Sequence, residues 1–196
     1  MTCAPVQTPA ESPDIVRRAE ALCRRLGFAS SCRPETGRLL QVLAASVVTG
    51  TILELGTGGG YGTAWLASGL RRADDARLVT IDLDQNLTAH VARLFDDWPA
   101  VDVLVGDWRD ALERGPLALI FVDASDAKST GIDEIVSALE PGGSVVLDDL
   151  TPLELWPDAW RGKSDPIRAA WLNHPGLTST EIRVAADHAA ILGVKR

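Results

Sequence analysis

The stretch ELGTGGGYGTAWLA, residues 54–67, is the most informative part of the sequence. It begins at the end of a short apolar run, TILEL (51–55), and continues into a segment with the composition of a helix. Glycines at 56, 58 and 60 let the backbone turn sharply and approach a ligand closely, which a Cβ atom would prevent. The stretch therefore predicts a strand, a glycine-rich turn and a helix, with a ligand bound at the turn.

The spacing of these glycines disfavours a dinucleotide as the ligand. The dinucleotide fingerprint is G-x-G-x-x-G, and counting from Gly56 its third glycine falls on Tyr61. Glu54, at the end of the strand, suits a ligand that carries an ammonium and a sulfonium better than one that carries two phosphates. A tight turn without a ligand and an NAD-binding loop stay open as alternatives.

Short apolar runs alternate with amphipathic segments along most of the chain. The predicted strands cover residues 51–55, 76–82, 101–107, 117–124 and 143–149. The predicted helices cover residues 13–27, 34–49, 60–70, 84–98, 108–115 and 131–143. Strands that are apolar on both faces are typical of a parallel sheet covered by helices on each side. The pattern predicts an α/β, doubly wound, mostly parallel sheet.

The end of the chain follows a different pattern. Residues 178–184 and 188–195 are both strand-like, and only the turn-like AAD separates them. Because this connection is too short for a helical crossover, the two strands should form an antiparallel hairpin at the sheet edge. We predict seven strands in a single domain, 1–196. It comprises a helical segment (1–50), a ligand-binding series (51–149), and a last segment with the hairpin (150–196).

Composition excludes several classes of protein. A chain of 196 residues that is 46% hydrophobic can bury one core. The net charge of −8, without a long Lys/Arg run, disfavours nucleic acid as a partner. The sequence has no apolar run of about 20 residues and no signal-like start, so we expect a cytoplasmic protein without a membrane span. Cys3, Cys23 and Cys32 lack metal spacing, which predicts free thiols.

From Ile52 onward the chain resembles a known family. The motifs ILELGTGGGYGT, VTIDLD, VGDWRDAL, LIFVDA and SVVLDD occur in the order seen in bacterial relatives of catechol and caffeoyl-CoA O-methyltransferases, which are class I methyltransferases. The resemblance implies S-adenosylmethionine bound across the strand ends. The implied contacts are Glu54, Gly56, Thr57, Gly58, Gly60 and Tyr61 around the methionine part, Asp82 and Leu83 at the ribose, Gly106, Asp107 and Trp108 near the adenine, and Asp123 beside the cofactor.

The resemblance also implies a metal site. In the metal-dependent branch of the family, one Asp after the fourth strand and an acidic-amide pair after the fifth bind a divalent cation; the matching positions are Asp123, Asp148 and Asp149. Mg²⁺ or Ca²⁺ would suit these oxygen ligands. The family's catalytic lysine lies three residues after the first Asp. Here that place is Asp126, and the nearest lysine, Lys128, is the candidate general base.

Two readings of this aspartate pair and of the following segment remain open. Asp148 and Asp149 could simply end a strand and cap the next turn. Residues 151–176 carry Trp156, Trp160 and Trp171, which we expect over the carboxyl ends of the strands as flat walls for a planar acceptor, or else as sheet cover or a dimer contact.

The sequence thus predicts methyl transfer from S-adenosylmethionine to a hydroxyl of a small, planar acceptor, assisted by a divalent metal. Metal-independent transfer to nitrogen or carboxylate and NAD-dependent oxidation are the alternatives. His90, His174 and His188 are scattered along the chain and should have surface or packing roles. Relatives often dimerise, which implies a homodimer.

Overall fold

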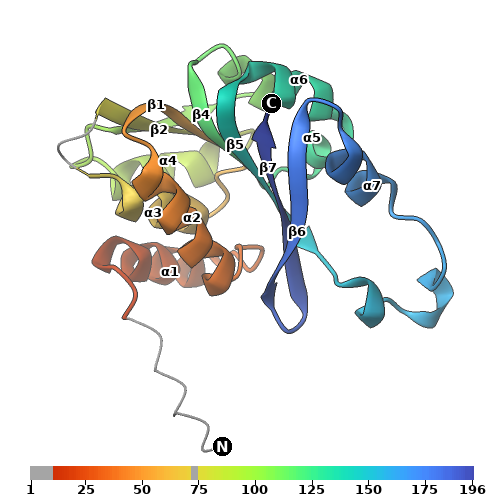
Figure 1. Ribbon diagram of the computed structural model, residues 1–196. Helices are drawn as coiled ribbons and strands as arrows, with labels where there is room; N and C mark the ends of the chain where they lie inside the picture. The colour runs from red at the N-terminus through yellow and green to blue at the C-terminus, as the bar shows by residue number, and fades with distance from the viewer. Residues whose placement is uncertain (1–10, 72–74) are drawn as a thin grey trace, which may run out of the picture.

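The computed structural model describes residues 11–71 and 75–196, and its centre is a twisted sheet (Figure 1). The strand order is β3-β2-β1-β4-β5-β7-β6. The strands are β1 (Thr49–Leu55), β2 (Asp75–Asp82), β3 (Val101–Val105), β4 (Leu117–Val122), β5 (Leu139–Leu150), β6 (Leu177–Ala185) and β7 (His188–Lys195). The first five are parallel, and β7 runs antiparallel to β5 and β6. The predicted seven-stranded, doubly wound sheet with a C-terminal antiparallel hairpin is confirmed.

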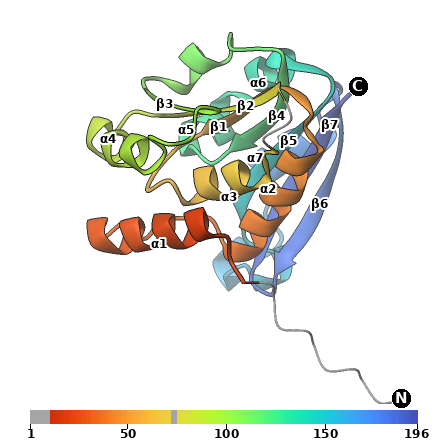
Figure 2. The same cartoon turned by 90° about the vertical axis from the view of Figure 1, so that its left-hand side faces the viewer.

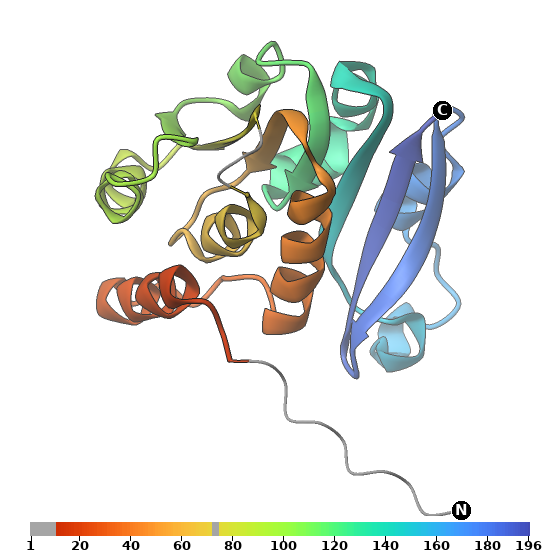
Figure 3. The same cartoon turned by 60° about the vertical axis from the view of Figure 1, so that its left-hand side comes forward.

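Helices cover both faces of the sheet (Figures 2 and 3). One face carries α1 (Asp14–Leu26), α2 (Pro34–Ser46), α3 (Tyr61–Gly69) and α4 (Gln85–Leu94). The other face carries α5 (Ser125–Thr130), α6 (Ile132–Ala138) and α7 (Pro166–Asn173). Among the described residues, no helix has both the length and the apolar character that a bilayer crossing requires.

The central strands contribute to two separate cores. Leu78 and Leu119 face the core beneath α1 to α4, whereas their neighbours Val79 and Ile120 face the core beneath α5 to α7. All four side chains are almost fully buried. This two-sided burial explains why the strands are continuous apolar runs rather than alternating ones.

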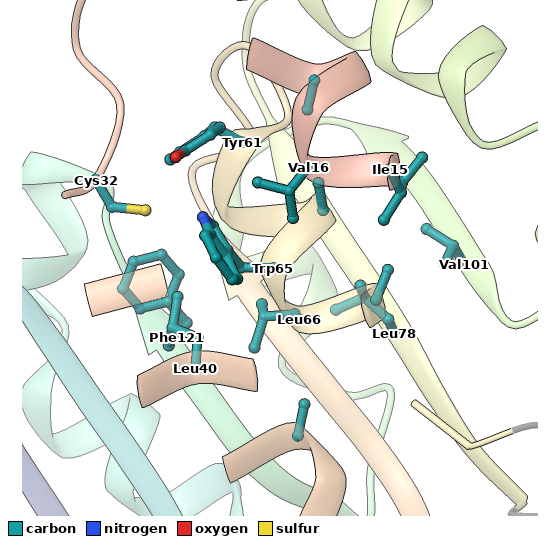
Figure 4. Packing of buried hydrophobic residues seen from close by; sticks show 14 of the residues in the cluster. Ile15, Val16, Cys32, Leu40, Tyr61, Trp65, Leu66, Leu78, Val101 and Phe121 are labelled. Atoms are coloured by element: carbon teal, nitrogen blue, oxygen red, sulfur yellow. The ribbon is translucent and has the colours of Figure 1, made fainter. Parts of the chain in front are cut away.

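Trp65 of α3 is the largest fully buried side chain of the first core (Figure 4). It lies among Leu40, Phe121 and Tyr61, and the Tyr61 ring meets it edge to face at 6.2 Å between centroids. Gly37 of α2 lies against the indole, because a Cβ at this position would be 2.3 Å from Cδ1 and Nε1 of Trp65. The absence of a side chain at residue 37 therefore sets how closely α2 approaches α3.

Two predicted helix ends are confirmed in detail. Gly27 ends α1 in the left-handed conformation, with φ of 66°. The Asp84 carboxylate caps α4 by accepting hydrogen bonds from the backbone N–H groups of Asn86 (2.8 Å) and Leu87 (3.1 Å).

Other predicted boundaries are wrong. Residues 108–115 form only a 3-10 turn, η1 (Trp108–Ala111), rather than a helix. The helix predicted over 131–143 ends at Ala138, because Leu139 already pairs with Leu117 of β4. The helix predicted over 34–49 ends at Ser46, since β1 begins at Thr49. Helices α5 and α7 were not predicted, because both are short and lack an apolar period.

The contact between α2 and α3 predicts a strong effect at Gly37. Gly37→Val should lower the free energy of unfolding by about 2 kcal/mol or more, because the new side chain overlaps the Trp65 ring in a close-packed core. Chemical denaturation measures this difference. Val42→Ala, on the same helix at a side chain that is 67% exposed, is the control and should change stability little. Equal stability of Gly37→Val and the wild type would contradict the packing described.

Candidate functional site

The carboxyl ends of β1 and β4 meet where the strand order reverses. The N–H of Gly56 donates to the carbonyl of Ile81 (3.0 Å), and the N–H of Asp123 donates to the carbonyl of Leu55 (2.9 Å). Gly56 has φ of 104°, and a Cβ there would be 2.9 Å from the backbone nitrogen of Ala124. Only glycine fits this position, and ligands of open α/β sheets bind at such a reversal point.

A cleft of about 460 Å³ opens at this point, which is a size that suits a small-molecule ligand. It is lined by many of the residues predicted to bind the cofactor: Gly56, Gly58, Asp82, Leu83, Gly106, Asp107, Trp108 and Asp123. Glu54, Thr57 and Tyr61 line a small cavity of about 10 Å³ that shares Gly56 and Asp123 with the cleft. Gly60 lies outside both, at the start of α3, where it packs against Val91.

The Asp82 carboxylate is fixed against the glycine loop. Its Oδ2 accepts the backbone N–H of Gly58 (2.9 Å), and its Oδ1 accepts the backbone N–H of Asp84 (3.0 Å). Each oxygen keeps lone-pair capacity for a further donor. The end of β2 therefore presents two acceptor atoms to the cleft, as the recognition of two neighbouring hydroxyls requires.

Glu54 is a fully buried carboxyl beneath the loop. Its Oε2 accepts hydrogen bonds from the hydroxyls of Thr80 (2.7 Å) and Thr63. Burial raises the pKa of Glu54 to about 8, although the two threonine hydroxyls oppose this shift. At neutral pH the group is mostly protonated, and a cation close to it would favour loss of that proton.

Lys128 lies between two of the predicted metal ligands. Its Nζ is 3.1 Å from Oδ1 of Asp123 and 2.5 Å from Oδ2 of Asp149. Burial alone would lower the pKa of Lys128, but the two carboxylates raise it overall. A raised pKa keeps the proton on Nζ, which opposes the predicted role of Lys128 as a general base and makes it a fixed positive charge.

Asp148 faces a different set of groups. Its Oδ1 accepts the hydroxyl of Thr36 (3.1 Å) and lies 3.0 Å from Nε2 of His188, while its buried Oδ2 has no partner among the described residues. Among the described residues, Asp148, Asp149 and His188 each offer one atom that could bind a metal ion. These three atoms lie within 4.8 Å of one another.

Asp123 is not part of that cluster, although its carboxyl lies close to the carboxyl of Asp149 and both contact Lys128. The packing role expected for His188 also needs correction, since its ring meets Asp148 at the site. The sequence feature that could have identified His188 is its position at the start of β7. Because Ala189 pairs with Leu150 of β5, His188 lies beside Asp148.

Phe28 and Ser30, between α1 and α2, also line the cleft and were not predicted.

Asp126 occupies the position of the family's lysine. Its carboxylate binds two side chains at the cleft, those of Trp108 and Arg109. Its Oδ2 accepts from Nε1 of Trp108 (3.2 Å) and from Arg109 (3.4 Å). The Arg109 guanidinium lies 4.0 Å from the centre of the Trp108 ring, a cation–π distance. This network holds the Trp108 indole largely buried at the predicted adenine end.

The tryptophans predicted to flank an acceptor lie outside the cleft. Trp156 and Trp160 meet edge to face at 5.8 Å and line a separate hollow. Trp171 is buried beneath α5, where its Nε1 donates to the carbonyl of Lys128 (2.9 Å). Trp171 therefore anchors the backbone that carries Lys128 and does not form an acceptor wall.

Comparisons with known proteins agree with this geometry. Residues 53–150 match a family model described as a methyltransferase domain. Catechol O-methyltransferase of Mycobacterium tuberculosis is 32% identical over 161 residues, which are 76% of this chain and 72% of that protein. Catechol O-methyltransferase of Niastella koreensis is 31% identical over 130 residues, which are 62% of this chain but only 58% of that relative.

A solved structure supports the fold. The O-methyltransferase from Bacillus cereus in complex with SAH has a TM-score of 0.76 against this chain at 20% identity. The match covers 96% of this chain and 93% of that one. At such an identity the likeness concerns the arrangement of helices and strands.

The buried carboxyl of Glu54 predicts a specific pH dependence. Because its pKa is higher in the folded state than the usual 4.5, this group's contribution to stability falls as pH rises from about 4.5 to about 8. Glu54→Gln cannot ionise, so its unfolding free energy relative to the wild type should improve across that range by several kcal/mol. Urea denaturation at several pH values tests this, with Glu113→Gln at an exposed position as the control. Parallel pH profiles for Glu54→Gln and the wild type would refute the assignment.

Proposed function

Because the chain belongs to the S-adenosylmethionine-dependent O-methyltransferases of the catechol and caffeoyl-CoA type, we propose that it transfers a methyl group from S-adenosylmethionine to a hydroxyl of a small acceptor. The observation that carries the proposal is the cleft at the strand reversal. Asp82, the glycine loop, Asp123 and Asp149 all line it.

The residues of the cleft fit S-adenosylmethionine. Gly56 and Gly58 present backbone without side chains, and Asp82 has acceptor capacity for the two ribose hydroxyls. Leu83 lines the cleft, is 75% exposed and offers an apolar surface to the cofactor. Glu54 lines a small cavity together with residues of the glycine loop, where its carboxyl group favours binding of the ligand's ammonium. When bound, the cofactor supplies a methyl group made electrophilic by its sulfonium.

The acceptor side of the reaction depends on charge. An acceptor hydroxyl placed at Asp149, which lines the cleft, ionises more easily because the neighbouring Lys128 ammonium favours the oxyanion. The hydroxyl proton passes to the Asp149 carboxylate, which is half-exposed and can release it to water. The acceptor oxygen then forms a bond to the methyl carbon in line with the breaking carbon–sulfur bond, whose electron pair stays on sulfur.

A divalent metal fits the predicted ligand set poorly. The Lys128 ammonium already contacts one oxygen of Asp123 and one oxygen of Asp149, and no step of this mechanism uses a metal ion. A catechol, a flat ring with two adjacent hydroxyls, is the first acceptor to test, because two relatives are named for it. Methylated catechol, detected by mass spectrometry, would support hydroxyl transfer. Turnover only with an amine or a carboxylic acid would favour the alternative acceptors.

Cofactor binding should depend on the ribose acid and the loop. Asp82→Ala removes charge-assisted hydrogen bonds worth about 1.5–3 kcal/mol, which predicts S-adenosylhomocysteine binding weaker by about tenfold or more. Gly58→Val should weaken it similarly, because φ is 49° there and a Cβ would meet the Phe28 ring at 2.7 Å. Isothermal titration measures the affinities.

The control for these titrations is Asp102→Ala, whose partner is Arg77 on the surface of the sheet. It should bind S-adenosylhomocysteine like the wild type. Melting temperatures show whether each variant is folded. Wild-type affinity in both folded cleft variants, or tight binding of NAD⁺ in place of S-adenosylhomocysteine, would overturn the cofactor assignment.

A further inference from the structure

Lys128 contacts two of the three carboxylates to which the resemblance assigns a divalent cation. We propose that its ammonium is the resident cation of this site, so that the protein needs no divalent metal between Asp123 and Asp149. The role of this ammonium in catalysis rests on the proposed function. Its occupancy of the site rests on the contacts of Lys128 alone.

The Lys128 ammonium already contacts one oxygen of each carboxylate. A bound Mg²⁺ or Ca²⁺ lies about 2.0–2.6 Å from its oxygen ligands. Nζ of Lys128 is already 3.1 Å from Asp123 and 2.5 Å from Asp149. A metal ion bound to the same two oxygens would lie against the ammonium, and the two positive charges would repel. Binding of a metal at these two oxygens therefore requires displacement of Lys128.

The backbone of Lys128 is held firmly in this place. Its N–H donates to the carbonyl of Ala124 (3.0 Å), and its carbonyl accepts Nε1 of Trp171 (2.9 Å). Both Trp171 and the neighbouring Ala127 are almost fully buried. The Lys128 side chain is itself only 10% exposed, so the ammonium has little access to solvent as an alternative to the two carboxylates.

Sequence position explains why this chain differs from the expected pattern. Asp126 stands three residues after Asp123, where the family has its lysine, and it is engaged with Trp108 and Arg109. Lys128 reaches the carboxylates from two residues further along α5. Asp149 also replaces the amide that usually completes the acidic pair, so an added negative charge meets the ammonium.

One other arrangement competes with this inference. Asp148, Asp149 and His188 could together bind a metal ion, and Oδ2 of Asp148 has no partner among the described residues. Oδ1 of Asp148, however, already serves both Thr36 and His188. An ion there would also compete with Lys128 for Asp149. Metal binding by the wild-type protein would reveal this arrangement directly.

The test compares the full chain with Lys128→Met after treatment with EDTA. Thermal unfolding and isothermal titration are recorded with Mg²⁺, Ca²⁺, Mn²⁺ and Zn²⁺. The wild-type melting temperature should not change with any of the ions, and its methyl transfer should be unaffected by EDTA. Lys128→Met leaves Asp123 and Asp149 without their cation, so metals should raise its melting temperature by mass action.

Lys128→Arg keeps the charge and should remain indifferent to metals. Lys163→Met, at an exposed lysine, is the matched control. A metal-dependent rise in the wild-type melting temperature, or loss of activity in EDTA, overturns the inference. So does a folded Lys128→Met that responds to metals no more than the wild type. If Lys128→Met does not fold, the metal titrations of the wild type and of Lys128→Arg decide the question alone.

None of the unfolding measurements needs methyl transfer. Failure of the proposed function would therefore appear separately, as absent binding of S-adenosylhomocysteine.

Discussion

The close approach of Gly56 to the backbone of Asp123 and Ala124 is the constraint on which the site depends. A Cβ at residue 56 would be 2.9 Å from the Ala124 nitrogen, so β1 and β4 can end side by side only with glycine there. This contact fixes the point at which the strand order reverses and the cleft opens. It also sets the start of α5, which carries Lys128 toward Asp149. The ligand loop and the acidic side of the cleft are therefore positioned by one contact.

The site gathers more carboxyl groups than it could keep ionised without compensation. Like charges brought together raise one another's pKa. The structure compensates each group differently. Burial keeps a proton on Glu54, backbone N–H groups bind Asp82, and Lys128 pairs with two further carboxylates. The remaining negative character suits a cofactor that carries both an ammonium and a sulfonium.

Sequence alone identified the features that depend on neighbouring residues. Two-sided apolar runs marked the central strands, and the position of Asp82 at a strand end marked the predicted ribose contact. Features that depend on tertiary pairing were missed. His188 lies forty residues from Asp148, and only the β5–β7 pairing brings them together. The partners of Lys128 could not be inferred either, because α5 is a short polar helix without an apolar period. The family pattern identified the metal ligands by their positions in the sequence. The contacts that Asp123 and Asp149 make depend instead on the Lys128 side chain, which meets both of them.

A crystal structure of the protein grown with S-adenosylhomocysteine and Mg²⁺ would show both the position of the cofactor and the cation that contacts Asp123 and Asp149. We expect ribose hydroxyls on the Asp82 carboxylate, the ligand's sulfur facing Asp149, and Nζ of Lys128 in contact with Asp123 and Asp149 without a bound metal. Ligand density away from Asp82, or a Mg²⁺ ion coordinated by Asp123 and Asp149 with Lys128 displaced, would contradict this expectation.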